Sequence, residues 1–253
     1  MKVVLLGTGD SPGTPVINCH CRTCEDARRR GWERKRFSIL IQDSNLNILV
    51  DTSPDLRRQL LENKIEKIDA VIWTHCHYDH FGGFGEFYRV QDNVKVYTTP
   101  QIHDAINKYM HFISYEAIEV NPYEKFEIGR ISFELVIVNH PPVDAVGVVA
   151  ECNGYKISIS GDTNIKIPEK SIEDMSSPDL LVVDAIAPSG KFRKHMNAYE
   201  ALQLSKRLKA KRTIFSHVSH LFPPLEEAKK IYPIGEDYQS FNFGDGLERF
   251  LGD

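Results

Sequence analysis

Short apolar runs, many rich in β-branched residues, recur along the whole chain and predict β-strands. Each run is too short for a typical helix and is bounded by polar or turn-forming residues. The predicted strands are Val3–Leu6, Phe37–Ile41, Ile48–Val50, Ala70–Trp73, Val94–Tyr97, Ile131–Val138, Val146–Glu151, Lys156–Ser160, Leu180–Val183 and Thr213–Phe215. The pattern therefore indicates a protein with many buried strands.

Helical patterns separate some of these strands and carry recognisable start signals. Pro54, Pro100 and Pro224 each stand just before or at the first turn of such a pattern, where the fixed φ of proline is tolerated. Glu200 follows Asn197 by three residues, which is typical of a capping box. The predicted helices are Asp55–Asn63, Gln101–Met110, Asn197–Leu208 and Leu225–Ile231. Strands interleaved with helices favour an α/β protein with central sheets and outer helices.

Composition supports one globular domain over residues 1–253. The chain is 42% hydrophobic and 26% charged, and we find no repeat, low-complexity tract or linker. A net charge of -4 argues against a general affinity for nucleic acid. The local basic runs, Arg28–Arg30, Arg34–Arg36 and Lys209–Arg212, are interpreted as solvated helix faces or loops.

The sequence predicts neither export nor membrane insertion. The apolar run that opens the chain, Val3–Leu6, is too short for the core of a signal peptide. No stretch approaches the length of a membrane span. We therefore expect a cytoplasmic protein, and the sequence leaves its oligomeric state open between a monomer and a homodimer.

Metal-binding residue types follow four of the predicted strands. His75, His140, Asp162 and His217 each stand just beyond the carboxyl end of a strand. Ligands of open sheets gather at this edge, and rigid strands hold side chains in a fixed geometry. The four residues are therefore candidates for one common site.

Three histidines and one aspartate fall within the six residues His75–His80. Side chains two positions apart in an extended segment point the same way, so His75 and His77 can share one ion. Asp79 and His80 follow the turn and can reach a second ion. A lone strand-end histidine is usually structural, but a fold gains little from clustered imidazoles, so the run indicates a metal site.

The other residues of this turn are given structural roles. Cys76 and Tyr78 alternate to the opposite side and are predicted to pack against the protein. Gly82 and Gly83 let the backbone leave a crowded turn without steric cost.

The order His-x-His-x-Asp-His, then a distant strand-end His, Asp and His, resembles the metallo-β-lactamase superfamily. The resemblance implies a four-layer αβ/βα sandwich with a two-metal site at one edge of the β-sandwich. It implies His75, His77 and His140 on one metal, Asp79, His80 and His217 on the other, and Asp162 bridging both. Asp79 is expected to be catalytic as well as a ligand.

Two further aspartates are candidates for roles beneath the metals. Asp51 matches the buried aspartate that the superfamily usually places under the site. Asp184 is either an acceptor for a ligand histidine N–H or a simple loop or cap residue. Imidazole-rich ligation suits zinc, and the carboxylates also admit manganese or iron.

Three cysteines, Cys19, Cys21 and Cys24, form a second candidate metal site. One more ligand would close a tetrahedral zinc site with a structural role, and His220 is the best candidate. His20 is a competing ligand, although its place between two ligating cysteines makes the geometry awkward. Free packing thiols and an iron–sulfur cluster are the other interpretations, and the second lacks a fourth nearby cysteine.

This cysteine loop is similar to one in a branch of the superfamily that contains the cyclic phosphodiesterases of the carbon–phosphorus lyase pathway. The similarity runs from about Gly7 to His220, and it implies a structural zinc at Cys19, Cys21, Cys24 and His220. His195 matches a histidine that contacts the substrate phosphate in that branch. As a lone loop histidine beside a helix N-terminus it would otherwise be unremarkable. Its role is left open between a general acid and a phosphate ligand.

The leading functional hypothesis is a phosphodiesterase that cleaves a small or cyclic ribose phosphodiester by attack of a metal-bridging hydroxide. A tRNA 3′-processing nuclease uses the same metal set but relies on a long arm, and no such insertion is present. A thioester or lactam hydrolase would lack the cysteine loop. A carrier like the pyrroloquinoline quinone biosynthesis proteins would have a degraded catalytic motif. The expected partner is therefore a small phosphodiester rather than nucleic acid or membrane.

Overall fold

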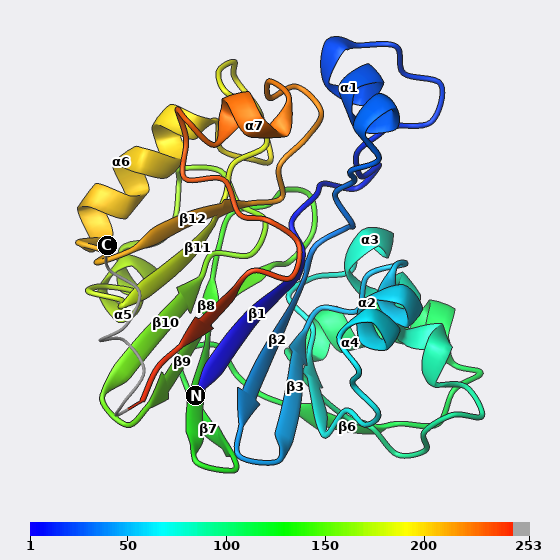
Figure 1. The fold of residues 1–253 in the computed structure, drawn as a ribbon. Helices are drawn as coiled ribbons and strands as arrows, with labels where there is room; N and C mark the ends of the chain where they lie inside the picture. Colours follow the sequence, from blue (N-terminus) through cyan, green and yellow to red (C-terminus); the bar gives the residue numbers. More distant parts are fainter. Residues whose placement is uncertain (245–253) are drawn as a thin grey trace.

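Two β-sheets face each other and carry helices on their outer sides in the computed structural model, which describes residues 1–244 (Figure 1). The first sheet has seven strands in the order β13-β1-β2-β3-β4-β5-β6. These are β13 (Ser240–Asn242), β1 (Lys2–Gly7), β2 (Ser38–Asp43), β3 (Leu46–Val50), β4 (Ala70–Ile72), β5 (Lys95–Thr98) and β6 (Glu116–Glu119). The second sheet has six strands in the order β12-β11-β10-β9-β8-β7. These are β12 (Thr213–Ser216), β11 (Leu180–Asp184), β10 (Tyr155–Ile159), β9 (Val146–Cys152), β8 (Ile131–Ile137) and β7 (Lys125–Ile128).

The helices form the two outer layers, except α1, which projects from the rest of the chain (Figure 1). Those beside the first sheet are α2 (Leu56–Glu62), α3 (Tyr78–Phe81), the 3₁₀ helix η1 (Gly82–Phe87) and α4 (Pro100–Met110). Those beside the second sheet are α5 (Glu169–Asp174), α6 (Ala198–Leu208) and α7 (Leu225–Ala228), and the projecting helix is α1 (Arg22–Arg30). None of the helices within residues 1–244 is long and apolar enough to cross a membrane.

Strand β11 shows why the layers form. Leu180 and Val182 point into the core between the sheets, whereas Leu181 and Val183 point into a second core against α5 and α6. Successive strand side chains face opposite sides, so an all-apolar strand needs cover on both faces. Each fully buried side chain of this kind contributes roughly 1.5–3 kcal/mol. The predicted four-layer αβ/βα sandwich is confirmed.

Parallel pairing brings the candidate ligands to one edge of the sheets. β3 runs parallel to β4, and β10, β11 and β12 are parallel to one another. Parallel strands end at the same edge, so the residues at or just after their carboxyl ends are neighbours. These are Asp51 after β3, His75 after β4, Asp162 after β10, Asp184 in β11 and His217 after β12.

The strands β6, β7 and β13 were not predicted, and all three lie at the edges of their sheets. Edge strands bury few side chains, and β6 has the largely exposed sequence Glu-Ala-Ile-Glu, which carries no apolar period. The helix expected over 225–231 is also shorter, since α7 ends at Ala228. One domain over 1–253 stays a prediction, and its residues 245–253 lie outside the described part of the chain.

Candidate metal centre

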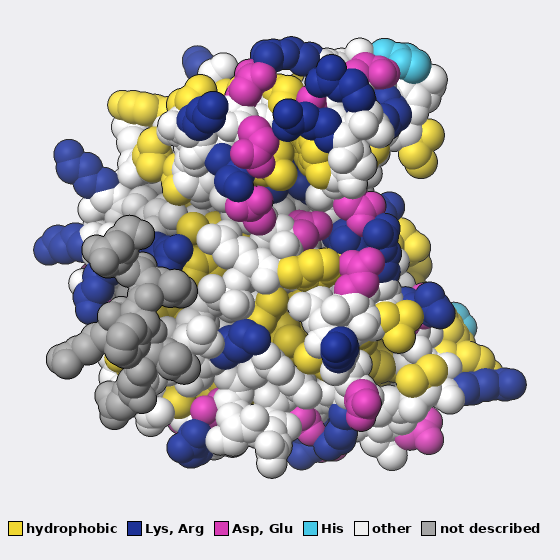
Figure 2. All heavy atoms as spheres, in the orientation of Figure 1, with side chains coloured by type: hydrophobic (Ala, Val, Ile, Leu, Met, Phe, Trp, Pro, Cys, Tyr) yellow, Lys and Arg dark blue, Asp and Glu magenta, His cyan; other side chains and the backbone are white. Residues whose placement is uncertain are grey.

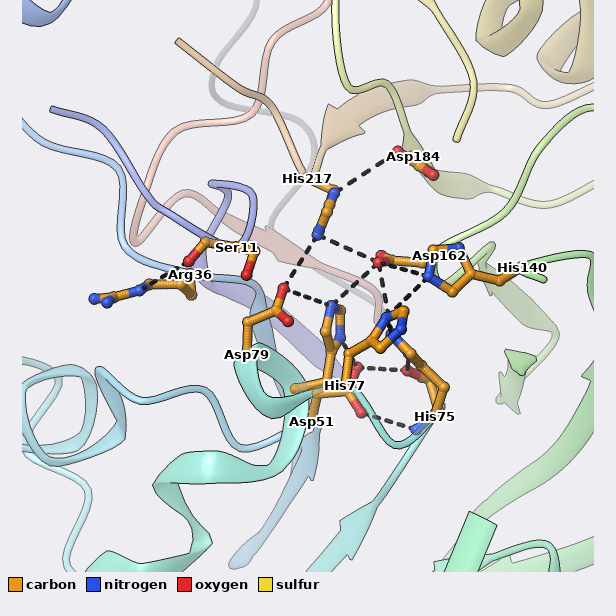
Figure 3. A network of polar contacts seen from close by, with 12 residues as sticks. Ser11, Arg36, Asp51, His75, His77, Asp79, His140, Asp162, Asp184 and His217 are labelled. Atoms are coloured by element: carbon orange, nitrogen blue, oxygen red, sulfur yellow. Dashed lines mark hydrogen bonds and ion pairs between the residues drawn. The ribbon is translucent and has the colours of Figure 1, made fainter. Parts of the chain in front are cut away.

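The imidazole rings of His75, His77 and His140 meet and form the first half of the site (Figure 3). The Nδ1 atom of His77 lies 3.0 Å from Nε2 of His75 and 3.0 Å from Nε2 of His140. Asp162 completes this group, with Oδ2 at 3.6 Å from Nε2 of His75 and 3.8 Å from Nε2 of His140. Each of these residues can therefore offer one atom to a common ion.

The second half of the site lies on the other side of Asp162. Oδ2 of Asp79 lies 3.4 Å from Nε2 of His80 and 3.6 Å from Nε2 of His217. The same Oδ2 atom of Asp162 lies 3.4 Å from Nε2 of His80 and 3.3 Å from Nε2 of His217. Asp162 therefore faces both groups, as a bridging ligand would.

The chemistry of these atoms fits divalent metal ions. Nε2 of His80 and Nε2 of His217 are buried and have no hydrogen-bond partner within the described residues. Leaving a buried polar atom unsatisfied costs about 1–3 kcal/mol, and a bound cation would satisfy both nitrogens. Imidazole nitrogens with carboxylate oxygens are a donor set for zinc, manganese or iron.

Asp51 orients two of the histidines from below. Its carboxylate accepts hydrogen bonds from the backbone N–H of Thr74 at 2.8 Å, from Oγ1 of Thr74 at 2.7 Å and from Nδ1 of His80 at 2.6 Å. Nδ1 of His75 lies 3.0 Å from Oγ1 of Thr74 and can donate to it. Both imidazoles therefore turn Nε2 toward the site. The sequence predicted that Asp51 lies beneath the site but did not indicate that Thr74 takes part in the same hydrogen bonds. The only sequence signal for Thr74 was its position directly before His75.

His195 lies beside His140 and His217 and is hydrogen-bonded to Asp184. Its Nδ1 donates to Oδ2 of Asp184 at 2.9 Å, and its ring stacks on His217 with centroids 4.9 Å apart. Burial disfavours the charged imidazole, but the carboxylate of Asp184 outweighs burial and raises the pKa of His195. The sequence left Asp184 open between an acceptor for a ligand histidine and a loop or cap residue, and Nδ1 of the ligand candidate His217 lies 4.0 Å from Oδ1 of Asp184. His195 is its closer partner.

His140 is oriented by a main-chain group instead of a carboxylate. Its Nδ1 donates to the carbonyl oxygen of Lys194 at 3.0 Å. This bond joins the loop before α6 to the metal-binding groups and places His195 beside them. The sequence could not indicate the contact, because a backbone carbonyl is independent of side-chain type.

The turn after His77 differs in part from its predicted packing. Cys76 is partly buried against the core, as expected, but the side chain of Tyr78 is 67% exposed. Tyr78 opens the short helix α3, so it does not continue the alternation of an extended strand. Gly83 does permit a close backbone approach, since a Cβ atom there would lie 1.8 Å from the carbonyl oxygen of Ser53.

We expect metal binding to release protons. In the metal-free protein, burial disfavours charged imidazoles, but nearby carboxylates raise the pKa of His217 to about 9 and that of His80 well above its usual range. Both shifts favour the protonated imidazole, which must lose a proton before Nε2 binds a metal, so zinc affinity should rise with pH up to about 9. Calorimetry in buffers of different ionisation enthalpy should show that these histidines release protons when zinc binds.

The His217→Ala variant is the control for this titration, because it removes one of the two protonated ligands and keeps the cysteines. It should release fewer protons than the wild-type chain. Zinc affinity that does not change between pH 6 and pH 9 would contradict the charge states assigned to His80 and His217.

The structure brings the three cysteines of the second candidate site together with His220. Nδ1 of His220 lies 3.2 Å from Sγ of Cys19, 3.5 Å from Sγ of Cys21 and 3.6 Å from Sγ of Cys24. The three thiols are free, and the four atoms are close enough to surround one ion. His20 turns away, with its side chain 78% exposed and Nδ1 2.9 Å from Glu25. The donor set fits a closed tetrahedral zinc site.

Local structure prepares Cys21 for this role. Cys21 is the N-cap of α1, and its sulfur accepts from the backbone N–H of Cys24. Burial disfavours the thiolate, but this hydrogen bond and those with His220 and the neighbouring thiols outweigh it and lower the pKa of Cys21 to about 6. A thiolate is the form of cysteine that binds metal.

Cys21→Ser is expected to lower the zinc content by about one ion per chain while sparing the histidine-rich cluster. Elemental analysis of the purified protein measures this directly. Cys152→Ala is the control, because Cys152 is a free thiol buried in β9 and lies in neither cluster. The structural zinc site is refuted if both variants keep the zinc content of the wild-type chain.

Comparison with known proteins identifies the family. A sequence model of the beta-lactamase superfamily domain matches residues 46–218, which is more than half of the chain. The protein belongs to the metallo-β-lactamase superfamily, as the order of its metal-binding residues predicted. A diphosphatase of the PhnP family superposes with a TM-score of 0.86 at 27% identity, covering 96% of this chain and 98% of that one. Zinc-bound PqqB from Methylobacterium extorquens superposes with a TM-score of 0.80 at 19% identity, covering 96% and 100%, and shares the fold.

A curated relative extends along the whole chain. An octanoyltransferase of Porphyromonas gingivalis is 28% identical across 99% of this chain, but the match covers only 52% of that protein. The matches thus span about half the length, or less, of this relative and of two coenzyme PQQ synthesis proteins B. The relative's name describes a protein about twice as long as the part that matches.

Proposed function

We propose that this protein is a dinuclear metal-dependent phosphodiesterase that hydrolyses a small or cyclic phosphodiester. The observation that carries the proposal is the position of Asp162. Its Oδ2 atom faces both groups of histidines, and the ring of His195 stacks on His217 beside them. The similarity to a diphosphatase of the PhnP family supports chemistry at phosphorus. In this proposal, His75, His77 and His140 would hold one ion, Asp79, His80 and His217 would hold the other, and Asp162 would be available to both.

Divalent ions in these groups would polarise the phosphodiester and make water nucleophilic near neutral pH. Hydrolysis adds water to phosphorus and breaks the ester P–O bond, so the departing alkoxide needs a proton. His195 can supply it, because Asp184 holds Nδ1 and leaves Nε2 free on the side of the metal-binding groups. Burial lowers the pKa of His195, but Asp184 outweighs burial and raises it, which favours the protonated imidazole that a general acid requires.

Surface charge argues against a polynucleotide substrate. Acidic and basic side chains are interspersed over the face in Figure 2, including the projecting α1 at its top. Arg28 pairs with Glu25 and Arg29 pairs with Asp26, so the arginines of α1 are partly neutralised. Nucleic-acid binding relies on unpaired cations that displace counterions. A small diester is therefore the preferred substrate class.

Thioester hydrolysis is the second candidate. The match of an octanoyltransferase to 99% of this chain favours thioester hydrolysis, because acyl transfer uses activated acyl groups such as thioesters. The same metal-binding groups could polarise a thioester carbonyl. A general acid is less needed there, since a thiolate leaves readily, and the ordered His195–Asp184 pair thus favours a phosphodiester.

Substrate assays test the proposal. The metal-loaded protein should hydrolyse bis(p-nitrophenyl) phosphate, a 2′,3′-cyclic nucleotide or a ribose 1,2-cyclic phosphate, and a chelator should abolish turnover. An octanoyl thioester is assayed in parallel under the same conditions. Thioester hydrolysis without any turnover of the diesters would overturn the proposal in favour of the second candidate.

A further inference from the structure

His217 differs from the other buried histidines of the metal centre in how its ring is held. His75, His80 and His140 each have Nδ1 within hydrogen-bond distance of an oxygen. Nδ1 of His217 has no such partner among residues 1–244, and Oδ1 of Asp184 is 4.0 Å away, too far for a hydrogen bond (Figure 3). The direction of this ring therefore depends more on the backbone of His217 than on a hydrogen bond.

The backbone of His217 adopts a conformation that histidine rarely takes. Its φ angle is 56°, which lies in the left-handed region. A residue other than glycine keeps such a conformation only when the surrounding structure imposes it. The contacts that hold residues 217–220 therefore help to set where Nε2 of His217 points.

The loop that carries the cysteines holds this segment at two points. Near the start of the loop, the backbone N–H of Val218 donates to the carbonyl oxygen of Thr8 at 2.8 Å, and Val218 forms a β-bridge with Gly9. Near its end, Nδ1 of His220 lies 3.2–3.6 Å from the three thiols of the cysteine cluster. The same loop thus contacts the residues on both sides of Ser219.

Only the second of these contacts depends on a metal. Thr8 is fixed by Asp237, whose Oδ1 accepts from the N–H of Thr8 at 2.9 Å and from its Oγ1 at 2.8 Å. Ser219 is fixed by its N–H and Oγ, which both donate to the carbonyl oxygen of Ile186. The ring of His220 meets sulfur atoms that a zinc ion would join, so this contact tightens only when the cysteine cluster is filled.

We propose that zinc in the cysteine cluster positions His217, so that filling this cluster raises the zinc affinity of the metal-binding group to which His217 belongs. We call Asp79, His80 and His217 the His217 group, and His75, His77 and His140 the His77 group. An anchored segment has fewer conformations to lose when Nε2 of His217 binds an ion. The His77 group has no ligand in this segment, so its affinity should not change. This coupling rests on the dinuclear site of the proposed function and on no particular substrate.

Zinc affinities measured by competition with a chelator test the coupling. Cys21→Ser empties the cysteine cluster, and serine can still cap α1. The His217 group should then bind zinc on the order of tenfold more weakly, whereas the His77 group keeps its affinity. Both groups stay filled in zinc-saturated protein, so the zinc content still falls by only one ion. Cys152→Ala is the control and should change neither affinity.

A double-mutant cycle shows whether the effect passes through His217. His217→Ala identifies the binding step that belongs to the His217 group. In this background Cys21→Ser should weaken zinc binding no further, because the side chain that the cysteine cluster positions is gone. A tenfold loss that persists in the His217→Ala background would overturn the coupling and show a general effect of the cluster on stability.

His220→Ala separates the link from the ion. Three cysteines remain to bind zinc, but the link to the segment is cut, so the affinity of the His217 group should fall as in Cys21→Ser. A variant that unfolds would lose zinc from both groups together, and Cys19→Ser then replaces it, because Cys19 neither caps α1 nor is buried.

Two outcomes distinguish a failure of the coupling from a failure of the proposed function. Wild-type protein that binds a single ion at the histidine-rich site would defeat the dinuclear proposal and the coupling with it. Two ions whose affinities are the same in the wild type and in Cys21→Ser would overturn the coupling alone.

Discussion

Replacing Asp162 by asparagine is expected to lower phosphodiester turnover by on the order of 10³-fold. Oδ2 of Asp162 lies 3.3–3.8 Å from Nε2 atoms of four histidines, from both metal-binding groups. Asparagine keeps the size but removes the charge that two cations would share. Metal-ion catalysis contributes several kcal/mol, and each ~1.4 kcal/mol is a factor of ten in rate. Turnover at saturating substrate and metal content measured together test this expectation.

A graded comparison separates a bridging ligand from a merely structural aspartate. Asp51→Asn should cost about 10–100-fold in metal affinity, because Asp51 orients His80 and Thr74 without facing an ion. Excess metal should restore much of the turnover of Asp51→Asn and little of that of Asp162→Asn. If excess metal restored both variants equally, Asp162 would not be the bridge.

The metal-binding residues could be predicted from the sequence because they stand at the ends of strands. His75, Asp162 and His217 each follow an apolar run. The parallel strands β10, β11 and β12 bring Asp162 and His217 to one edge, and the packing of the two sheets brings His75 beside them. The cysteine cluster was predictable for another reason, since Cys19, Cys21 and Cys24 are local and require only one distant ligand. The strand pattern also predicted central sheets with outer helices, whereas the four-layer arrangement was implied by the resemblance to the superfamily.

Contacts that depend on three-dimensional packing could not be read in this way. The carbonyl of Lys194 orients His140, yet its role does not depend on the lysine side chain. Tyr78 was expected to pack inward by strand alternation, but the chain turns into α3 at that residue. The pairing of Asp184 with His195 similarly depends on how the loop before α6 folds back over β11.

His195→Ala is expected to lower turnover by on the order of 10²–10⁴-fold while both metal clusters keep their ions. The size of the loss should depend on the leaving group. A p-nitrophenolate departs without a proton, so bis(p-nitrophenyl) phosphate should lose far less than an alkyl or cyclic ribose diester. A loss that is the same for both substrates would show that His195 binds phosphate and does not act as the acid.

The pH profile of Asp184→Asn gives an independent test of the acid. A general acid must be protonated, so turnover falls as pH rises through the pKa of His195. Asp184 raises this pKa, and its loss should move the fall in activity to lower pH. His195→Ala should abolish this limb of the profile. If the limb stayed at the wild-type pH in both variants, it would belong to another group, and the pairing of His195 with Asp184 would serve only to hold the loop over the metal-binding groups.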